Sequence, residues 1–143
     1  MLKYSLLGVV VCFFSNTMLA QSDTDGPDMT QITETLMDYI EGSTNGQPNR
    51  LKTAFHPDLN LYYVKDGELK VWSGKDYIAD TKEGKPTGEI GKIIAIDYEN
   101  DIATAKVQIS NPRSSTPYVD YFMLMKINGK WTIIHKMFTK RVN

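Results

Sequence analysis

The sequence has a single cysteine, Cys12, and it lies within the first twenty residues. If those residues are removed as a leader, the remaining chain has no thiol. It could then form no disulfide, no cysteine-ligated metal site and no cysteine nucleophile. Its stability would have to come from a packed core alone.

The first twenty residues have the pattern of a secretory signal peptide. Lys3 precedes an apolar run over residues 6–14, and Ala20 stands before Gln21 where cleavage would occur. The run is too short to cross a bilayer as a helix of the mature protein. We therefore predict a signal peptide at residues 1–20, a polar linker at 21–27 and one domain at 28–143. We also expect export to the periplasm or outside the cell.

The sequence also has few histidines, no excess of basic charge and no nucleotide-binding motif. The two histidines, His56 and His135, lie far apart, and neither a glycine-rich phosphate loop nor a Gly-x-Ser-x-Gly elbow occurs. Removing Lys3 leaves 15 basic and 17 acidic side chains, a net charge of −2. We therefore expect no metal and no cofactor. We expect no nucleic-acid partner and no membrane association after cleavage.

What the sequence does contain is a series of helix and hairpin signals. Asp28 followed by Gln31 has the pattern of a capping box, as does Ser73 followed by Asp76. The predicted elements are helices at 28–42, at 48–55 and after residue 73, and strands at 59–64, 68–72, 89–98, 102–110, 118–127 and 130–140. Helices clustered before a run of strands predict an α+β domain with a curved antiparallel sheet of about six strands.

The last hairpin turns at Asn128-Gly129, and its register decides which side chains share a face. A two-residue turn would pair Lys126 with Trp131. A three-residue loop with a bulge at Gly129 would place Asp120 opposite Lys136. We favour the second register because it separates the charged side chains from the apolar face.

Several short segments resemble one known family. They are Ala54-Phe-His-Pro57, Ile96-Asp97, Ala103-Thr-Ala-Lys106, Val119-Asp-Tyr121, Leu124, Gly129-Lys-Trp131 and Lys136. With the element order, they resemble the NTF2-like (SnoaL-like) superfamily, and within it the small bacterial family labelled putative lumazine-binding. The resemblance implies a cone of helices packed in a curved sheet with a cavity between them. It does not imply one activity, because many activities share this fold.

Asp120 and Lys136 are the leading candidates for the site, because the resemblance implies that their face lines the cavity. Together they could hold a polar ligand, or Asp120 could accept a proton as a catalytic base. The alternative is a structural ion pair across the two strands, which would contribute little to function or stability.

His56 and the aromatic residues complete the candidate set. His56 could reach the cavity mouth as an acid or base, or it could simply cap the preceding helix. Related isomerases use a tyrosine donor and a carboxylate base. Tyr39 fits the donor, but Asn60 and Tyr62 stand where the base is expected. The predicted ligand-binding residues are Tyr39, Phe55, His56, Tyr62, Asp120, Phe122, Lys136 and Phe138, with Asp120 and His56 as catalytic candidates.

Three functions remain open at this stage. They are an exported binding protein for a small polar or aromatic molecule, an isomerase-, dehydratase- or hydrolase-type enzyme, and a structural dimerisation module. The favoured register also predicts an apolar outer face and a homodimer formed through it. The predicted interface residues are Val119, Tyr121, Met123, Met125, Ile127, Trp131, Ile133 and Met137.

Overall fold

The computed structural model describes residues 26–142, so the predicted signal peptide and all but the end of the linker lie outside it. Within this part of the chain there are three helices and six strands. They are α1 (Pro27–Thr44), α2 (Pro48–Ala54), β1 (Asn60–Lys65), β2 (Glu68–Ser73), α3 (Gly74–Asp80), β3 (Ile90–Glu99), β4 (Ile102–Ser110), β5 (Tyr118–Ile127) and β6 (Lys130–Lys140). The predicted α+β order is confirmed, with element ends shifted by one or two residues.

The six strands form one curved sheet in the order β2-β1-β6-β5-β4-β3. Neighbouring strands are antiparallel except β1 and β6, which pair in parallel with Leu61 beside Lys136. The parallel pair makes the sheet mixed, where the sequence predicted an antiparallel one. It arises because the chain leaving α2 joins the sheet beside β6, where His56 N–H donates to the Ile133 carbonyl at 2.9 Å.

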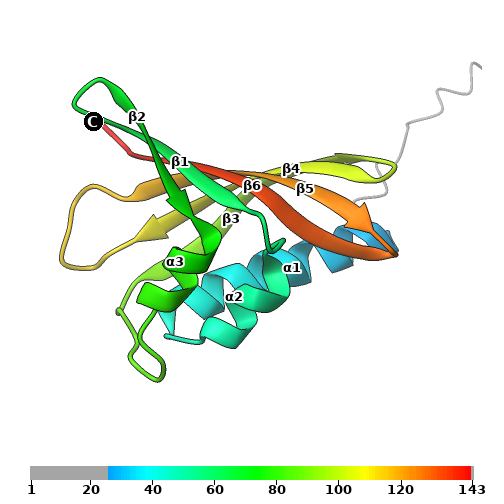
Figure 1. The fold of residues 1–143 in the computed structure, drawn as a ribbon, viewed down its shortest axis with the longest axis horizontal. Coiled ribbons are helices and arrows are strands. Elements are labelled where there is room, and N and C mark those ends of the chain that lie inside the picture. Colours follow the sequence, from blue (N-terminus) through cyan, green and yellow to red (C-terminus); the bar gives the residue numbers. More distant parts are fainter. Residues whose placement is uncertain (1–25, 143) are drawn as a thin grey trace, which may run out of the picture.

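The three helices lie against one face of the sheet, and its other face carries no described helix (Figure 1). The core forms between the two layers. The alternation of residues over 102–110 predicts Ala103, Ala105, Val107 and Ile109 on the inner face of β4, and all four are buried against the helices. On α1, Ile32, Leu36, Tyr39 and Ile40 supply the buried stripe.

Helix α1 begins one residue earlier than predicted, and its start is stabilised differently. Gly26 is the N-cap, Pro27 occupies the first turn, and no side chain caps the helix, so the predicted capping box is wrong. Asp28 instead accepts hydrogen bonds from Lys126 Nζ at 2.6 Å and from Trp131 Nε1 at 2.8 Å. It thereby ties α1 to the β5–β6 hairpin. Lys126, whose place near the hairpin tip predicts a solvated ammonium group, is instead one partner in this tie.

The Asp28 contacts predict a pH dependence of stability. The hydrogen bond from Lys126, then that from Trp131, hold the pKa of Asp28 below its usual value of 3.8. A lowered folded-state pKa stabilises the protein above the unfolded-state pKa, and this stabilisation is lost as pH falls through the folded-state value. We expect urea unfolding between about pH 5 and pH 2 to show a component that Asp28→Asn removes. The exposed Asp97→Asn should leave it in place; equal effects would contradict the tie.

The β5–β6 register combines features of both predicted alternatives. Asn128 and Gly129 have φ values of 51° and 79°, and Lys126 pairs with Trp131, so the turn has two residues and the predicted Gly129 bulge is wrong. A bulge occurs further along, because Leu124 pairs with Ile133 while Met123 pairs with His135. It shifts the later part of β6 by one residue.

This bulge changes the side of the sheet on which β6 residues lie. Beyond it, Lys136 and Phe138 join Asp120 and Phe122 on the helix-facing side, as predicted, although Asp120 pairs with Phe138 rather than Lys136. Before it, Trp131 and Ile133 are buried in the core and not on the predicted outer face. Val119, also predicted at the interface, is 6% exposed.

Candidate functional site

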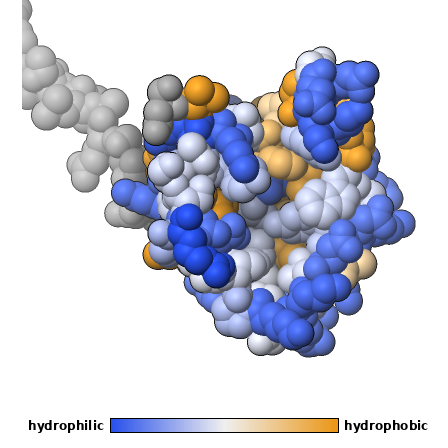
Figure 2. All heavy atoms as spheres, turned by 90° about the vertical axis from the view of Figure 1, so that its left-hand side faces the viewer, coloured by the Kyte–Doolittle hydropathy of each residue, from blue (hydrophilic) through white to orange (hydrophobic). Residues whose placement is uncertain are grey.

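A cavity of about 420 Å³ opens where the C-terminal end of α1 meets the sheet. Figure 2 shows this end of the molecule, with hydrophilic side chains at its rim and hydrophobic ones between them. The lining residues are Tyr39, Ser43, Gly46, Trp72, Tyr77, Asp80, Thr81, Lys82, Lys85, Pro86, Thr87, Glu89, Ile109, Tyr118, Asp120, Lys136 and Phe138. Its rim is polar and its walls carry aromatic rings, as in many small-molecule sites.

Three polar side chains meet at the inner end of the cavity. Tyr39 Oη donates to Asp120 Oδ2 at 2.6 Å and accepts from Lys136 Nζ at 2.7 Å. Lys136 Nζ also lies 3.2 Å from Asp120 Oδ2. The exposed fractions are 2% for Tyr39, 1% for Asp120 and 4% for Lys136, so this is a fully desolvated, internally paired cluster. We call it the Tyr39–Asp120–Lys136 cluster.

Aromatic rings surround the ammonium group of Lys136. The distances from Nζ to the ring centroids are 4.7 Å for Tyr39, 5.0 Å for Phe138, 5.3 Å for Tyr77 and 5.9 Å for Phe122. Each ring within about 6 Å attracts a cation through its quadrupole. The rings and the Asp120 carboxylate therefore make a pocket that favours positive charge at Nζ.

The cluster also fixes which groups can act on a ligand. Burial raises the pKa of Tyr39 well above its usual range, and the neighbouring Tyr77 and Asp120 side chains raise it further. Tyr39 therefore remains a phenol and a proton donor. Among residues 26–142, both polar contacts of the carboxylate involve Oδ2, so Asp120 Oδ1 is the oxygen left to accept from a ligand. The cluster presents one acceptor and one cation side by side.

The loop between α3 and β3 forms the rim of the cavity and rests on the end of α1. Thr87 N–H donates to the Thr44 carbonyl and Gly84 N–H to the Gly46 carbonyl, both at 2.8 Å. Gly46 has φ +65°, and a Cβ atom there would lie 2.4 Å from the Lys82 carbonyl oxygen. Only glycine allows so close an approach, so this residue sets where the rim lies.

The structure brings most of the predicted site residues together, but not all. Tyr39, Asp120, Lys136 and Phe138 line the cavity, and Phe122 packs edge-on against Tyr39 with ring centroids 4.8 Å apart. This placement agrees with the predicted set, while the binding role itself stays a prediction.

Phe55 and His56 lie elsewhere. Both line a second cavity of about 580 Å³ between α2 and α3. Phe55 still stacks on Tyr39, with ring centroids 5.9 Å apart, and so helps to hold the Tyr39 ring in place. Of the two placements that the sequence left open for His56, the cavity mouth is wrong, because His56 is not among the residues lining the cavity that holds Asp120. The loop before β1 lies on the opposite side of α3, where the parallel pairing of β1 with β6 places it.

Tyr62 is the clearest error in the predicted set. It pairs with Met137 and stacks on His135 with ring centroids 4.7 Å apart, which places it on the outer face of the sheet. Its neighbour Tyr63 stacks on Phe138 at 4.9 Å, next to the site. Tyr62 therefore lies on the face of β1 opposite to the predicted one.

Some lining residues were not predicted at all. Tyr118 lies two positions before Asp120 on β5, and the period of two along a strand could have identified it. Ser43, Thr87 and Glu89 belong to segments without a periodic pattern, and no sequence signal marks them.

Among residues 26–142, no group of three or more His, Asp or Glu side chains could hold a metal ion. None of the described helices is long and apolar enough to cross a membrane.

The profile of the family described as "Putative lumazine-binding" matches residues 27–139. The match extends from the first residue of α1 to one residue before the end of β6. The chain belongs to this family. The resemblance noted from the sequence is thereby confirmed, and residues 27–139 of this family member form one unit of the NTF2-like fold.

Two solved structures share this fold, and one further protein is similar in sequence. The chain is 33% identical over 103 residues to "Aldolase FrzH" from Cladobotryum sp., a match that covers 70% of this chain and 81% of the relative. An NTF2-like protein of unknown function from Methylobacillus flagellatus has a TM-score of 0.69 at 28% identity, covering 80% of this chain and 93% of that one. Another, from Shewanella baltica, has a TM-score of 0.69 at 24% identity, covering 81% and 95%.

Proposed function

We propose that the protein binds a small molecule carrying a polar group and a flat or aromatic part in its 420 Å³ cavity. The observation that carries this proposal is the Tyr39–Asp120–Lys136 cluster, which is buried yet lines the cavity. A ligand would accept from Lys136 Nζ and donate to Asp120 Oδ1. Its apolar part would pack against Trp72 and Tyr118. The family description, which names a small heterocycle, supports the same reading.

The test is native mass spectrometry of the protein purified from its own host, in search of a retained small molecule. We expect a bound mass on the wild type. We expect Asp120→Asn to reduce the bound fraction by about tenfold or more, because a hydrogen bond to a charged group contributes roughly 1.5–3 kcal/mol. The matched control is Asp97→Asn, which makes the same change at an exposed residue of β3. A bound mass that survives Asp120→Asn unchanged would contradict the proposed site.

A second candidate function is catalysis of proton transfer in the same cavity. It is supported by a carboxylate and a phenol 2.6 Å apart, one an acceptor and the other a donor, at a desolvated site. The relative named as an aldolase supports it as well, because aldol chemistry requires proton removal beside a carbonyl group. Asp120 is then the base and Tyr39 the donor; His56, in the other cavity, takes no part. Deuterium uptake by an added ketone in heavy water, lost in Asp120→Asn, is the measurement that tests it.

We further propose that the protein forms a homodimer through the outer face of its sheet. The described helices cover only the other face, and apolar side chains on the outer face of β5 and β6 remain accessible, with Tyr121 46%, Met123 49% and Met137 48% exposed. A monomer rarely leaves a contiguous apolar patch of this kind in water. Methionine adapts readily to the surface of a second copy. An open cavity in the same domain argues against a purely structural dimerisation module.

Met123→Lys is therefore expected to convert a dimer to a monomer at micromolar concentration, because a lysine at the centre of the patch would bury an unpaired charge. Analytical ultracentrifugation of the chain lacking residues 1–20 measures this directly. Val64→Lys is the control, since it lies on β1, which β6 separates from β5, and is itself 70% exposed. A wild-type monomer, or a variant that still dimerises, would contradict the interface.

Export remains a proposal supported by the sequence of residues 1–20, which lie outside the described part of the chain. Fractionation of the native host, with N-terminal sequencing of the recovered protein, tests it. We expect a mature protein in the exported fraction that begins near Gln21.

A further inference from the structure

We propose that Lys136 bonds covalently to a carbonyl substrate, its Nζ condensing with a ketone or aldehyde in the cavity to form an iminium ion. The inference rests on the proposed binding function and adds the chemical class of the ligand and the atom that holds it. It follows from three features of the cluster: the placement of the amine, the charge preference of its surroundings, and a hydrogen-bonded path for the protons.

The first feature is placement. Lys136 is 4% exposed and is one of the residues that line the cavity, so a molecule in the cavity lies against this side chain while bulk water is almost excluded from it. The lysines at the rim, Lys82 and Lys85, are exposed. A lysine amine becomes an effective nucleophile when it is desolvated and held against its target. Within residues 26–142, Lys136 is the lysine that combines burial with access to a cavity.

The second feature is charge. A resting ammonium and an iminium each carry one positive charge at the same nitrogen. The aromatic rings within 6 Å of Nζ and the carboxylate at 3.2 Å therefore stabilise both species. Condensation leaves the charge of the buried cluster unchanged. A desolvated site penalises any reaction that creates or removes net charge, and this reaction does neither.

The third feature is a path for the proton that Nζ must lose. Lys136 Nζ donates to Tyr39 Oη at 2.7 Å, and Tyr39 Oη donates to Asp120 Oδ2 at 2.6 Å. A proton passed along these two bonds leaves a neutral amine and a protonated Asp120. The amine lone pair then forms the C–N bond with the carbonyl carbon as the C=O π bond breaks, and a proton from that nitrogen passes to the carbonyl oxygen, which becomes a hydroxyl group.

The remaining steps balance within the cluster. The hydroxyl group of this adduct receives a proton from the cluster, its C–O bond breaks, and water leaves as the C=N bond forms. In sum, an ammonium and a carbonyl compound give an iminium ion and one water, with no proton gained or lost. Asp120, a carboxylate again, then faces the carbon beside the iminium and can remove its proton to give an enamine. No oxidant, reductant or further reactant is needed.

The experiment traps the iminium ion. The wild-type protein is incubated with phenylacetone, a ketone whose ring suits the aromatic walls, and with sodium cyanoborohydride, which reduces the iminium to a stable secondary amine. Peptide mass spectrometry then locates the added mass. We expect labelling of Lys136 at least about tenfold above any other lysine, because the cavity holds amine and carbonyl together.

The chain offers a matched internal control. Lys126, on the same hairpin, is also paired with a carboxylate, at 2.6 Å from Asp28, but lies outside the cavity. Labelling of Lys126 equal to that of Lys136, or an absence of label on Lys136, would overturn the inference. Both readings come from the wild-type protein, so they do not depend on a variant that folds.

Two variants test the proton path. Tyr39→Phe keeps the ring but interrupts the two hydrogen bonds, and we expect the labelling rate of Lys136 to fall about a hundredfold. Lys136→Arg keeps the charge, and the peptide should carry no label. An unchanged rate in Tyr39→Phe would overturn the assigned path.

Failure of the inference is distinguishable from failure of the proposed function. Phenylacetone that quenches tryptophan fluorescence without labelling Lys136 would leave a binding site and remove the covalent step. The retained-ligand measurement on the host protein judges binding independently of this probe.

Discussion

Replacing Lys136 by methionine is expected to lower the free energy of unfolding by about 3–5 kcal/mol. Methionine fills most of the volume of the lysine stem, so the loss comes from charge and not from a cavity. The variant leaves the Asp120 carboxylate, 1% exposed, without its cation. Urea unfolding followed by tryptophan fluorescence measures the change. A loss below about 1 kcal/mol would show that the pair behaves like an exposed ion pair.

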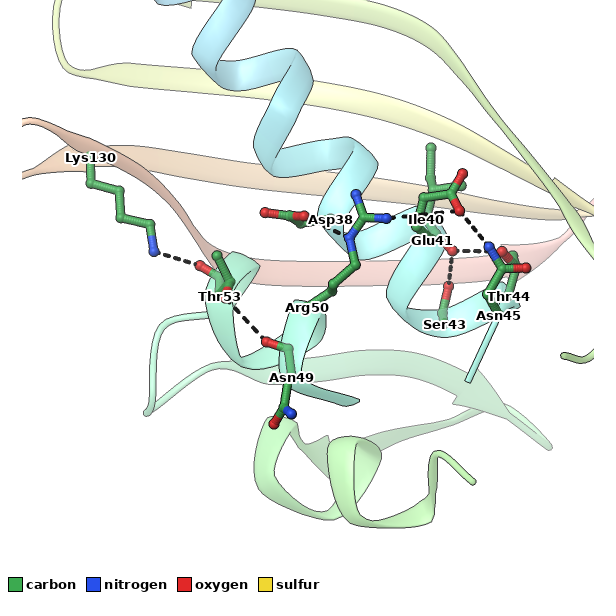
Figure 3. A network of polar contacts seen from close by, with 10 residues as sticks. All are labelled: Asp38, Ile40, Glu41, Ser43, Thr44, Asn45, Asn49, Arg50, Thr53 and Lys130. Atoms are coloured by element: carbon green, nitrogen blue, oxygen red, sulfur yellow. Dashed lines mark hydrogen bonds and ion pairs between the residues drawn. The ribbon is translucent and has the colours of Figure 1, made fainter. Parts of the chain in front are cut away.

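Two controls distinguish the cost of the uncompensated Asp120 charge from a general loss of stability. Adding Asp120→Asn to Lys136→Met removes both charges and should recover much of the lost stability, because the uncompensated charge is then gone. Arg50→Met breaks an ion pair of similar length between α2 and α1, with Arg50 Nε 2.8 Å from Asp38 Oδ1 (Figure 3). That pair is partly exposed, so its loss should cost about 1 kcal/mol or less.

The double variant also tests whether the buried pair serves stability or ligand binding. If it is nearly as stable as the wild type but retains no ligand, stability alone does not explain the buried pair. A well-packed apolar pair would serve the fold as well or better. The cavity would then be the reason that a carboxylate, a phenol and an ammonium occupy a site that could have been closed by the core.

The helices and strands could largely be predicted because their signals are local. The Ser73 side chain accepts from Asp76 N–H at 3.1 Å, as the capping pattern indicated. The alternation on β4 placed four residues in the core correctly. Asp28 shows what a local pattern cannot predict, because an aspartate near a helix start can either cap the helix or bind a distant strand. Only folding brings Lys126 and Trp131 to Asp28.

The residues at the inner end of the cavity were predicted and several at its rim were missed, for a related reason. Asp120 and Lys136 lie on strands joined by a short turn, so few registers were open to them. Even so, the turn and the bulge were each predicted wrongly. Beyond Ile134 the two errors cancelled for the face on which residues lie but not for their pairing, since Asp120 pairs with Phe138. Tyr62 depended on the pairing of β1 with β6, which are far apart in sequence. No local pattern specified that pairing or the parallel direction of the two strands.

The largest loss of stability outside the site is expected for Trp131→Ala, about 3–5 kcal/mol. Trp131 is 1% exposed, its ring lies edge-on to Tyr98 at 6.4 Å, and its carbonyl accepts from Thr35 Oγ1 at 3.0 Å. Truncation would leave a large void between α1 and the β5–β6 hairpin. It would also remove the indole donor to Asp28. Chemical unfolding monitored by circular dichroism gives the measurement.

Trp131→Phe divides this loss into its two causes. Phenylalanine retains much of the packing but cannot donate to Asp28, so we expect roughly 1.5–3 kcal/mol from the lost hydrogen bond together with the smaller ring. In an Asp28→Asn background the two substitutions should be non-additive, because they remove the same contact. Additive effects would show that Asp28 is held by Lys126 alone. A Trp131→Ala protein as stable as the wild type would indicate that Trp131 lies on the outer face of the sheet. It would then contradict the β5–β6 register that places Asp120 and Lys136 in the cavity.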